Sequence, residues 1–378
     1  MSTSDWNLPE TDVFDQIRTA LDEGTPAVLA TVTAVEGSAY RRPGAKMLLR
    51  PDGEGVGSIT AGCLEDEVRA LAEEVLTDGV PRVETWDLTG DDDVWGFGVG
   101  CNGVITVLLE PLDDSYREVV DSRLAGDAIG VATVVGGESD ASVGDRVYYR
   151  PDEGFVGGDV DEEVLVELSQ RMRDLLDSGA GETVAVGGDE EAVEVFLDGI
   201  RPPPKLVVFG SGHDVEPVAE LAKLSDFRVT VVSFRGSRAD AEQFPRADDV
   251  VSSSPREVTD LVAWDENTYA VVMSHNFVDD RLTLEQLLET PAPYIGLMGP
   301  RKRFEEMREA LDEEGRTLTD EERERIYTPV GLNLGADTPY QIALSIVSEV
   351  LAVARDRQPR HLTRHEGPIH DRADVTNE

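Results

Sequence analysis

Cys63 and Cys101 are the residues of this chain best suited to soft-metal or sulfur chemistry, and each follows a glycine in a segment typical of a turn. Cys63 also comes just before an expected helix from Glu65 to Leu76, whose N-terminus favours the thiolate form. A thiolate ligates soft metal centres and carries sulfur. The alternative for both residues is the common one, a cysteine that packs as a small hydrophobic side chain.

A second candidate is the glycine-bounded loop Gly37-Ser-Ala-Tyr-Arg-Arg-Pro-Gly44, which contains Ser38, Arg41 and Arg42. Guanidinium groups present a fork of donors that suits a phosphate or the edge of a pterin. Pairing of the two arginines with surface carboxylates is the alternative.

The third candidate is a glycine turn between two apolar runs. Leu206 to Phe209 is followed by Gly210-Ser-Gly212-His213, an amphipathic segment and a second run from Val229 to Val232. This order predicts strand, turn, helix and strand, the first half of a nucleotide-binding βαβ unit. Gly210 permits the tight turn, and Gly212 lets backbone N–H groups approach a phosphate at the helix N-terminus. His213 lies in the turn itself.

Two details of this unit disfavour ordinary NAD binding. The third position of the glycine fingerprint holds Val215, and Ser233 ends the second strand, where an acidic residue would hold a ribose. Farther on, His275 follows a buried strand, Tyr269 to Met273, and is expected at the carboxyl edge of the sheet, where ligands bind.

The elements that position these residues repeat before residue 200, at an offset of about 100 residues. Ala30-Thr-Val32 recurs as Ala132-Thr-Val134, and Lys46 to Gly53 recurs loosely as Arg146 to Gly154. The second copy lacks both cysteines and the paired arginines. If both copies share one scaffold, the residues found only in the first copy are expected to have a chemical role and not a structural one.

The expected fold class is therefore α/β, with a pseudo-duplicated N-terminal domain over residues 1–200. Arg201-Pro-Pro-Pro204 is a stiff linker, and a Rossmann-like parallel-sheet domain follows over 205–355. Within it, a helix is expected from Pro255 to Ala263. Residues 356–378 form a polar tail. The tail includes the zinc-like pair His361 and His365, without further ligands.

The composition is strongly acidic. Lys and Arg number 34 and Asp and Glu 77 among 378 residues, which gives a net charge of −43. Such a charge excludes nucleic acid and anionic membranes as partners, and it is typical of proteins that work in near-molar, halophilic salt. Neither a signal peptide nor a membrane-spanning run is apparent, so a cytoplasmic location is expected.

Taken together, these stretches resemble the xanthine dehydrogenase accessory factor (XdhC/CoxI) family. The matching segments are Ala30 to Ser38, Arg42 to Met47, Gly57 to Glu65, Gly210 to His213, Ser274-His275, Tyr294 to Arg301 and Pro329 to Pro339. The resemblance implies a molybdenum cofactor (molybdopterin) binding protein, a chaperone more than an enzyme. Such a protein protects the cofactor during sulfuration and inserts it into a xanthine dehydrogenase-like molybdenum hydroxylase. It also implies a cysteine desulfurase as a partner and a homodimer.

The resemblance assigns Cys63 as the catalytic and metal-contacting residue. The expected cofactor-binding residues are Ser38, Arg41, Arg42, Gly62, Cys63, Glu65, Cys101, Gly210, Gly212, His213 and His275. This chain departs from the family pattern at Ala61, Asn102 and Ser233, where the family has glycine, glycine and an acid. An NAD(P)-dependent oxidoreductase is the alternative function, and a regulatory nucleotide sensor is a third.

Overall fold

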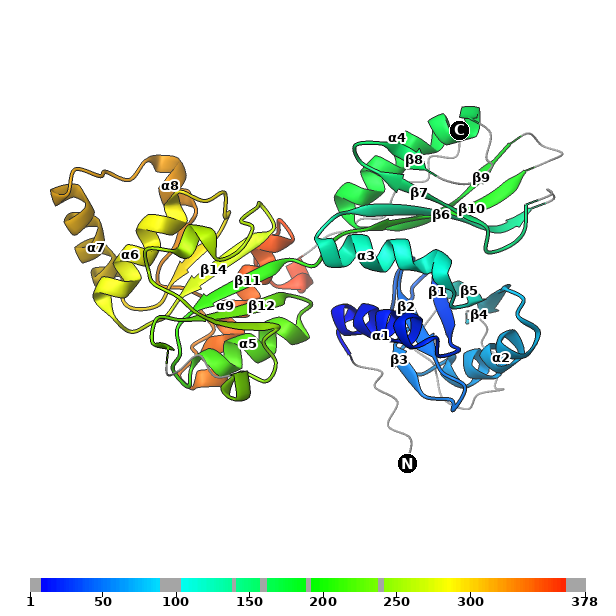
Figure 1. Cartoon of the computed structure of the whole chain (residues 1–378), viewed down its shortest axis with the longest axis horizontal. Helices are drawn as coiled ribbons and strands as arrows, with labels where there is room; N and C mark the ends of the chain where they lie inside the picture. Colours follow the sequence, from blue (N-terminus) through cyan, green and yellow to red (C-terminus); the bar gives the residue numbers. More distant parts are fainter. Residues whose placement is uncertain are drawn as a thin grey trace. The chain divides into compact units, whose positions relative to one another are not determined.

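The strands of the chain form three sheets. The structure, a computed structural model, describes residues 8–88, 103–137, 141–156, 162–187, 192–236 and 241–364. Two sheets are antiparallel and one is parallel. The antiparallel sheets belong to a first unit, Met1–Pro203, and the parallel sheet to a second, Pro204–Glu378 (Figure 1).

The first copy of the repeat pairs its five strands in the order β3-β2-β1-β5-β4. Its elements are α1 (Glu10–Glu23), β1 (Val28–Gly37), β2 (Lys46–Leu49), β3 (Gly55–Gly57), α2 (Glu65–Asp78), β4 (Arg82–Asp87) and β5 (Gly103–Pro111). The helix α1 ends where Gly24 adopts a left-handed conformation, the usual glycine C-cap.

The second copy has the same strand order, β8-β7-β6-β10-β9. Its elements are η1 (Asp114–Tyr116), α3 (Arg117–Ala125), β6 (Ile129–Gly137), β7 (Arg146–Arg150), β8 (Gly154–Val156), α4 (Glu162–Ser178), β9 (Gly181–Val186) and β10 (Val193–Ile200). A register shift in the strand pairing also recurs at equivalent places. It lies between Val32 and Ala34 in β1 and between Val134 and Gly136 in β6. The predicted duplication is confirmed.

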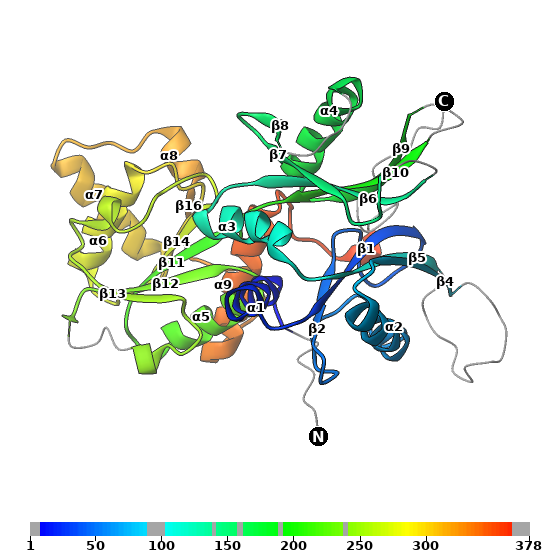
Figure 2. The same ribbon diagram turned by 45° about the vertical axis from the view of Figure 1, so that its right-hand side comes forward.

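Packing within this unit also follows the duplication. Helix α1 covers the first sheet, α3 covers the second, and the two helices lie side by side (Figures 1 and 2). They share one apolar cluster that includes Phe14, Leu29, Val120 and Val131. Helices α2 and α4 pack on separate clusters, each with strands of its own sheet.

The second unit is a doubly wound α/β fold. Its elements are β11 (Lys205–Phe209), α5 (Val215–Leu224), β12 (Arg228–Ser233), η3 (Ala241–Gln243), β13 (Asp249–Ser252), η4 (Val258–Asp260), β14 (Thr268–Val272), α6 (Phe277–Leu288), β15 (Ile295–Leu297), α7 (Arg301–Glu313), α8 (Asp320–Glu324), β16 (Ile326–Tyr327), α9 (Pro339–Ala354) and η5 (Leu362–Arg364). The strands are parallel, in the order β13-β12-β11-β14-β15-β16. This is the 3-2-1-4-5-6 order of dinucleotide-binding folds.

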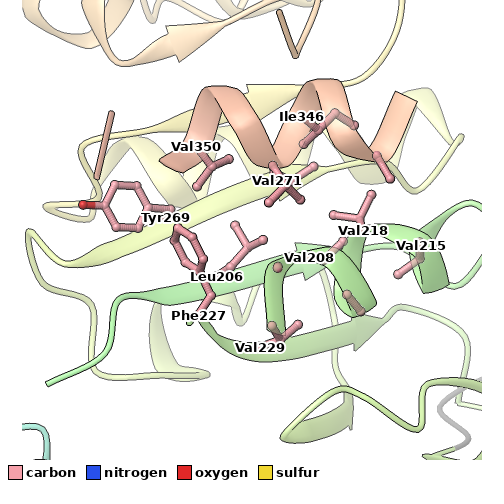
Figure 3. Close-up of a cluster of buried hydrophobic side chains, with 14 of the residues drawn as sticks. Leu206, Val208, Val215, Val218, Phe227, Val229, Tyr269, Val271, Ile346 and Val350 are labelled. Atoms are coloured by element: carbon pink, nitrogen blue, oxygen red, sulfur yellow. The ribbon is translucent and has the colours of Figure 1, made fainter. Parts of the chain in front are cut away.

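Helices cover both faces of this sheet, as its continuous apolar strands require. Figure 3 shows one face, where Ile346 and Val350 of α9 pack over Val271 of β14. The other face packs against α6 and α7 through Leu284 and Leu311. The topological switch point therefore lies between the carboxyl ends of β11 and β14.

The helix predicted from Pro255 to Ala263 is wrong, because only the short 3₁₀ turn η4 forms there. The indole N–H of Trp264 donates to the Val258 carbonyl at 3.0 Å. The same carbonyl also accepts from the Leu261 N–H at 3.3 Å, the i→i+3 bond of a 3₁₀ turn. Among the described residues, no helix has the length and apolar character that crossing a bilayer requires.

Candidate functional site

The loop after β1 exposes two of its three predicted functional side chains. Ser38 and Arg42 face solvent, and no described residue forms an ion pair with Arg42. Arg41 differs, because its Nη2 lies 3.7 Å from Oε2 of Glu10 at the start of α1. Arg42 is therefore available to an anionic ligand, whereas Arg41 is shared with a carboxylate.

A buried ion pair between the two copies holds the end of this loop. Nζ of Lys46 donates to the Gly44 carbonyl at 2.9 Å and to Oδ2 of Asp198 at 2.5 Å. Burial by itself lowers the pKa of Lys46, but the attraction of Asp198 outweighs it, so the net pKa is raised. The charged lysine thus fixes Gly44, two residues after Arg42.

The start of the loop lies against β5. Gly37 pairs with Gly103, and a Cβ at position 103 would lie 2.6 Å from the carbonyl oxygens of Glu36 and Ser38. A side chain at 103 would therefore displace the Ser38 backbone. Cys101 lies outside the described residues, so its predicted role stays a prediction.

Cys63 is exposed on a tightly hydrogen-bonded turn before α2. The Glu65 carboxylate, 2% exposed, accepts from the backbone N–H groups of Gly62 and Leu64, each at 3.0 Å, and from the Thr60 hydroxyl at 2.6 Å. The same Thr60 oxygen accepts from the Cys63 N–H at 3.1 Å. The carboxylate of Glu65, a predicted cofactor-binding residue, is thus buried in the turn, where it holds Gly62 and Leu64 on either side of Cys63.

Both loops rest on the same apolar cluster. Ala39, next to Ser38, packs against the cluster that contains Ile59 and Leu64, which flank the Cys63 turn. The first copy therefore presents a thiol, a hydroxyl and a guanidinium from two loops with a common support. Across the described residues, no group of three or more His, Cys, Asp or Glu side chains is arranged to hold a metal ion by itself.

In the second unit, the glycine turn joins β11 to α5 as predicted. A Cβ at Gly210 would lie 2.7 Å from the Met273 carbonyl oxygen, so the turn passes close to the end of β14. A Cβ at Gly212 would meet Oδ1 of Asp214 at 2.4 Å. His213 is exposed. The turn therefore places glycine backbone at the N-terminus of α5, a position that favours a phosphate.

His275 lies at the carboxyl end of β14, as expected for a ligand-binding edge. Its Nε2 is 2.7 Å from Oδ2 of Asp214, which joins the glycine turn to the β14 loop across the switch point. Its φ is 60°, a left-handed conformation that is uncommon outside glycine. Residues held in this way concentrate at functional sites.

Two carboxylates of this edge escaped the sequence analysis. Asp214 pairs with His275, and Asp280, 3% exposed, accepts from the Ser274 hydroxyl and its backbone N–H. Asp280 also accepts from Nη2 of Arg303 at 2.6 Å. Only their positions in the sequence could have indicated these two carboxylates. Asp214 follows the glycine turn, and Asp280 follows Asn276, the N-cap of α6.

Each unit presents its own candidate ligand groups. The turn at Gly210 and Gly212, where a Cβ would meet the Met273 carbonyl oxygen and the Asp214 side chain, lies at the N-terminal end of α5 and suits a phosphate. The exposed thiol of Cys63 suits a soft metal or a sulfur atom, and Arg42 suits an anionic edge. The glycine turn lies in the second unit, whereas Cys63 and Arg42 lie in the first.

Comparison with known proteins agrees with this division. Residues 206–350 match the XdhC Rossmann domain, and residues 20–87 match the XdhC and CoxI family. The chain is 30% identical over 340 residues to a probable xanthine dehydrogenase subunit of Bacillus subtilis, covering 88% of this chain and 94% of that protein.

Two further relatives span nearly the whole chain. The molybdenum cofactor insertion chaperone PaoD of Escherichia coli is 25% identical over 357 residues, or 92% of each protein. The crystal structure of a xanthine dehydrogenase from Bacillus halodurans aligns with a TM-score of 0.73 at 29% identity, covering 91% of this chain and 96% of that one. From these matches, the chain belongs to the XdhC and CoxI family.

Proposed function

We propose that this protein is a maturation factor that binds molybdenum cofactor, protects it during sulfuration and inserts it into a xanthine dehydrogenase-type molybdenum hydroxylase. The observation that carries the proposal is the Cys63 turn, because it presents a thiol to solvent on a rigid support. The names of the two near full-length relatives, a cofactor insertion chaperone and a probable xanthine dehydrogenase subunit, support the same role.

In this proposal each described group has one task. Cys63 contacts the metal or the incoming sulfur, while Arg42 and Ser38 donate to the anionic and polar edges of the cofactor. In the second unit, the backbone from Gly210 to His213 holds a phosphate, and His275 is a polar contact beside it. When bound, the cofactor supplies the molybdenum chemistry.

Binding of molybdenum cofactor to the full chain, with NADH as competitor, tests this proposal. Cys63→Ala is expected to weaken binding and to impair activation of the client hydroxylase. Ala61→Ser, an exposed substitution on the same turn, is the matched control and is expected to leave both unchanged. Normal client activation with Cys63→Ala would show that the thiol has no such role.

Glu65→Gln separates positioning from chemistry. Glutamine keeps one acceptor oxygen but loses the charge that receives three hydrogen bonds. We expect weaker cofactor binding than in the wild type, with a larger effect on hydrogen exchange around Gly62 than on the global unfolding transition. Unchanged exchange at this turn would refute the positioning role of Glu65.

An NAD(P)-dependent oxidoreductase is the second candidate, and the strand order of the parallel sheet favours it. It predicts nicotinamide-nucleotide binding, a substrate-reducing activity and no need for Cys63. NADH binding without cofactor binding in the same assay would select this alternative.

A further inference from the structure

The carboxyl ends of β12 and β13 have an unusual composition for so acidic a chain. Ser233 ends β12 and is followed by Phe234 and Arg235, while Ser252 ends β13 and is followed by Ser253, Ser254, Pro255 and Arg256. Hydroxyl and guanidinium groups thus collect at one edge of the sheet. The residues assigned to the molybdenum cofactor role do not include these two strand ends.

The two turns are in contact and internally hydrogen-bonded. Oγ of Ser233 accepts from the Arg235 N–H at 3.2 Å and donates to the Arg235 carbonyl at 2.9 Å. The Ser253 N–H donates to the Ser233 carbonyl at 3.1 Å, which extends the pairing beyond the two strands. Oγ of Ser254 accepts from the Arg256 N–H at 3.3 Å. The backbones that carry Arg235 and Arg256 are therefore held in place.

Both arginine side chains are open to a ligand. Arg235 and Arg256 are exposed, and neither forms an ion pair with any residue in the described part of the chain. The chain has 77 acidic residues against 34 basic ones, so two arginines without a carboxylate partner on adjacent turns are notable. A net charge of −43 repels anionic ligands, and a local cationic site offsets that repulsion.

The position of this edge in the fold suggests what it binds. In 3-2-1-4-5-6 sheets, a diphosphate lies on the glycine turn after the first strand and the adenosine ribose lies at the end of the second. An acid there binds the 2′-hydroxyl, whereas a nearby arginine accommodates a 2′-phosphate on the ribose. This chain has Ser233 in place of the acid, with Arg235 two residues later.

The chain that follows β12 also returns to the glycine turn. Nε2 of Gln243 donates to the Ser211 carbonyl at 3.4 Å. The phosphate cradle and the β12 end are thus parts of one continuous edge. Phe234 stacks on Phe209 at 5.9 Å between ring centroids, which stiffens the strand end before Arg235.

We propose that the second unit binds an adenosine nucleotide that carries a phosphate monoester on its ribose, with Arg235 and Arg256 contacting that phosphate. Such ligands include nicotinamide dinucleotides with a 2′-phosphate and nucleotides of the coenzyme A type with a 3′-phosphate. This inference goes beyond the proposed molybdenum cofactor role; the two share the glycine turn from Gly210 to His213, but the inference does not depend on Cys63.

Calorimetric titration of the full chain tests the proposal with 2′,5′-ADP, 3′,5′-ADP and 5′-AMP, which lacks only the ribose phosphate. At least one bisphosphate is expected to bind more tightly than 5′-AMP by a factor of about ten or more. Charge-assisted hydrogen bonds to a phosphate add that much affinity. Preference for the 2′ or the 3′ isomer then identifies the ligand class. Equal affinity for all three compounds would overturn the proposal.

Variants locate the contact. Arg235→Ala and Arg256→Ala are each expected to reduce bisphosphate affinity towards that of 5′-AMP while leaving 5′-AMP binding unchanged. Arg246→Ala is the control, because Arg246 is exposed near the amino end of β13, at the opposite edge of the sheet. If neither substitution reduces bisphosphate affinity, or if the control reduces it equally, the assigned site is wrong. These titrations contain no molybdenum compound. A negative result therefore contradicts the nucleotide site without contradicting the proposed molybdenum cofactor role.

Discussion

Replacement of Lys46 by methionine tests how the two copies of the first unit are joined. The Lys46–Asp198 pair is 3% and 10% exposed, so the substitution leaves a buried carboxylate without its partner. Breaking one side of a buried pair costs about 3–5 kcal/mol. The Gly44 carbonyl also loses a donor, which is expected to loosen the loop that carries Arg42.

Hydrogen exchange followed by mass spectrometry is the appropriate assay, because it reports each unit of the full chain separately. Lys46→Met is expected to lower the free energy of exchange protection of peptides from β1 and β2 by about 3–5 kcal/mol. Peptides of the parallel sheet should be unaffected and serve as an internal reference. The double variant Lys46→Met/Asp198→Leu is expected to recover most of the loss, since apolar replacements of buried pairs are often neutral or better.

A matched control is the exposed pair between Arg117 and Asp22, which also joins the two copies at 2.8 Å. Arg117→Met is expected to cost less than about 1 kcal/mol, as exposed pairs do. If Lys46→Met costs no more than this control, or if the double variant is as unstable as the single one, the pair does not act as a desolvated anchor.

Three further predictions concern other parts of the chain. Tyr116 Oη is buried without a hydrogen-bond partner among the described residues, and burial raises the pKa of Tyr116. Because the folded pKa lies above the unfolded value of about 10, the protonated phenol contributes its full stability below about pH 10. This contribution is lost as the pH rises further. Tyr116→Phe should therefore change stability by no more than about 1 kcal/mol at pH 7 and raise the midpoint of alkaline unfolding; an unshifted midpoint would contradict this. Gly210→Ala should destabilise the second unit by about 1–3 kcal/mol, because the new Cβ meets a backbone carbonyl, whereas Gly212→Ala meets only the movable Asp214 side chain and should cost less; equal losses in urea unfolding would refute the distinction. Raising KCl from about 0.1 M to about 2 M should raise the melting temperature, because salt at that concentration screens the net charge of −43; an unchanged melting temperature would argue against adaptation to high salt.

The features that the sequence predicted correctly depend on local patterns. The glycine turn and its flanking strands are set by about 30 consecutive residues, and the duplication is visible because Lys46 to Gly53 recurs as Arg146 to Gly154. The helix predicted from Pro255 to Ala263 is only the 3₁₀ turn η4, and the Trp264 indole N–H donates to its Val258 carbonyl. Helix propensities do not include such a side-chain hydrogen bond.

Long-range partners account for most of what the sequence did not reveal. Lys46 and Asp198 are 152 residues apart, and His275 and Asp214 are 61 apart. In a chain with 77 acidic residues, nothing in the sequence marks these two carboxylates as the paired ones. Glu65 stays a predicted cofactor-binding residue, and its sequence position does not reveal that its carboxylate is 2% exposed and accepts three hydrogen bonds within the turn.

The buried ion pair of the first copy has a counterpart in the second. Arg146, at the position of Lys46, pairs with Glu110 of the first copy, and both side chains are 7% exposed. The preceding glycines, Gly44 and Gly144, have φ values of 95° and 96°, and their N–H groups donate to Val32 and Val134 at 2.8 and 2.9 Å. The end of the loop is therefore the same scaffold in both copies.

What differs between the copies is the pair of residues two and three positions before that glycine. The first copy has Arg41 and Arg42, and the second has Ala141 and Ser142. Because the second copy forms the same loop end without arginine, folding of this loop does not require Arg42. Its guanidinium is exposed and has no ion-pair partner in the described part of the chain, so we expect it to serve a ligand. Lys46 and Arg146 thus hold equivalent positions of the duplicated scaffold, and we expect the chemistry of this unit in the first copy, because its predicted cofactor-contacting residues have no counterparts in the second.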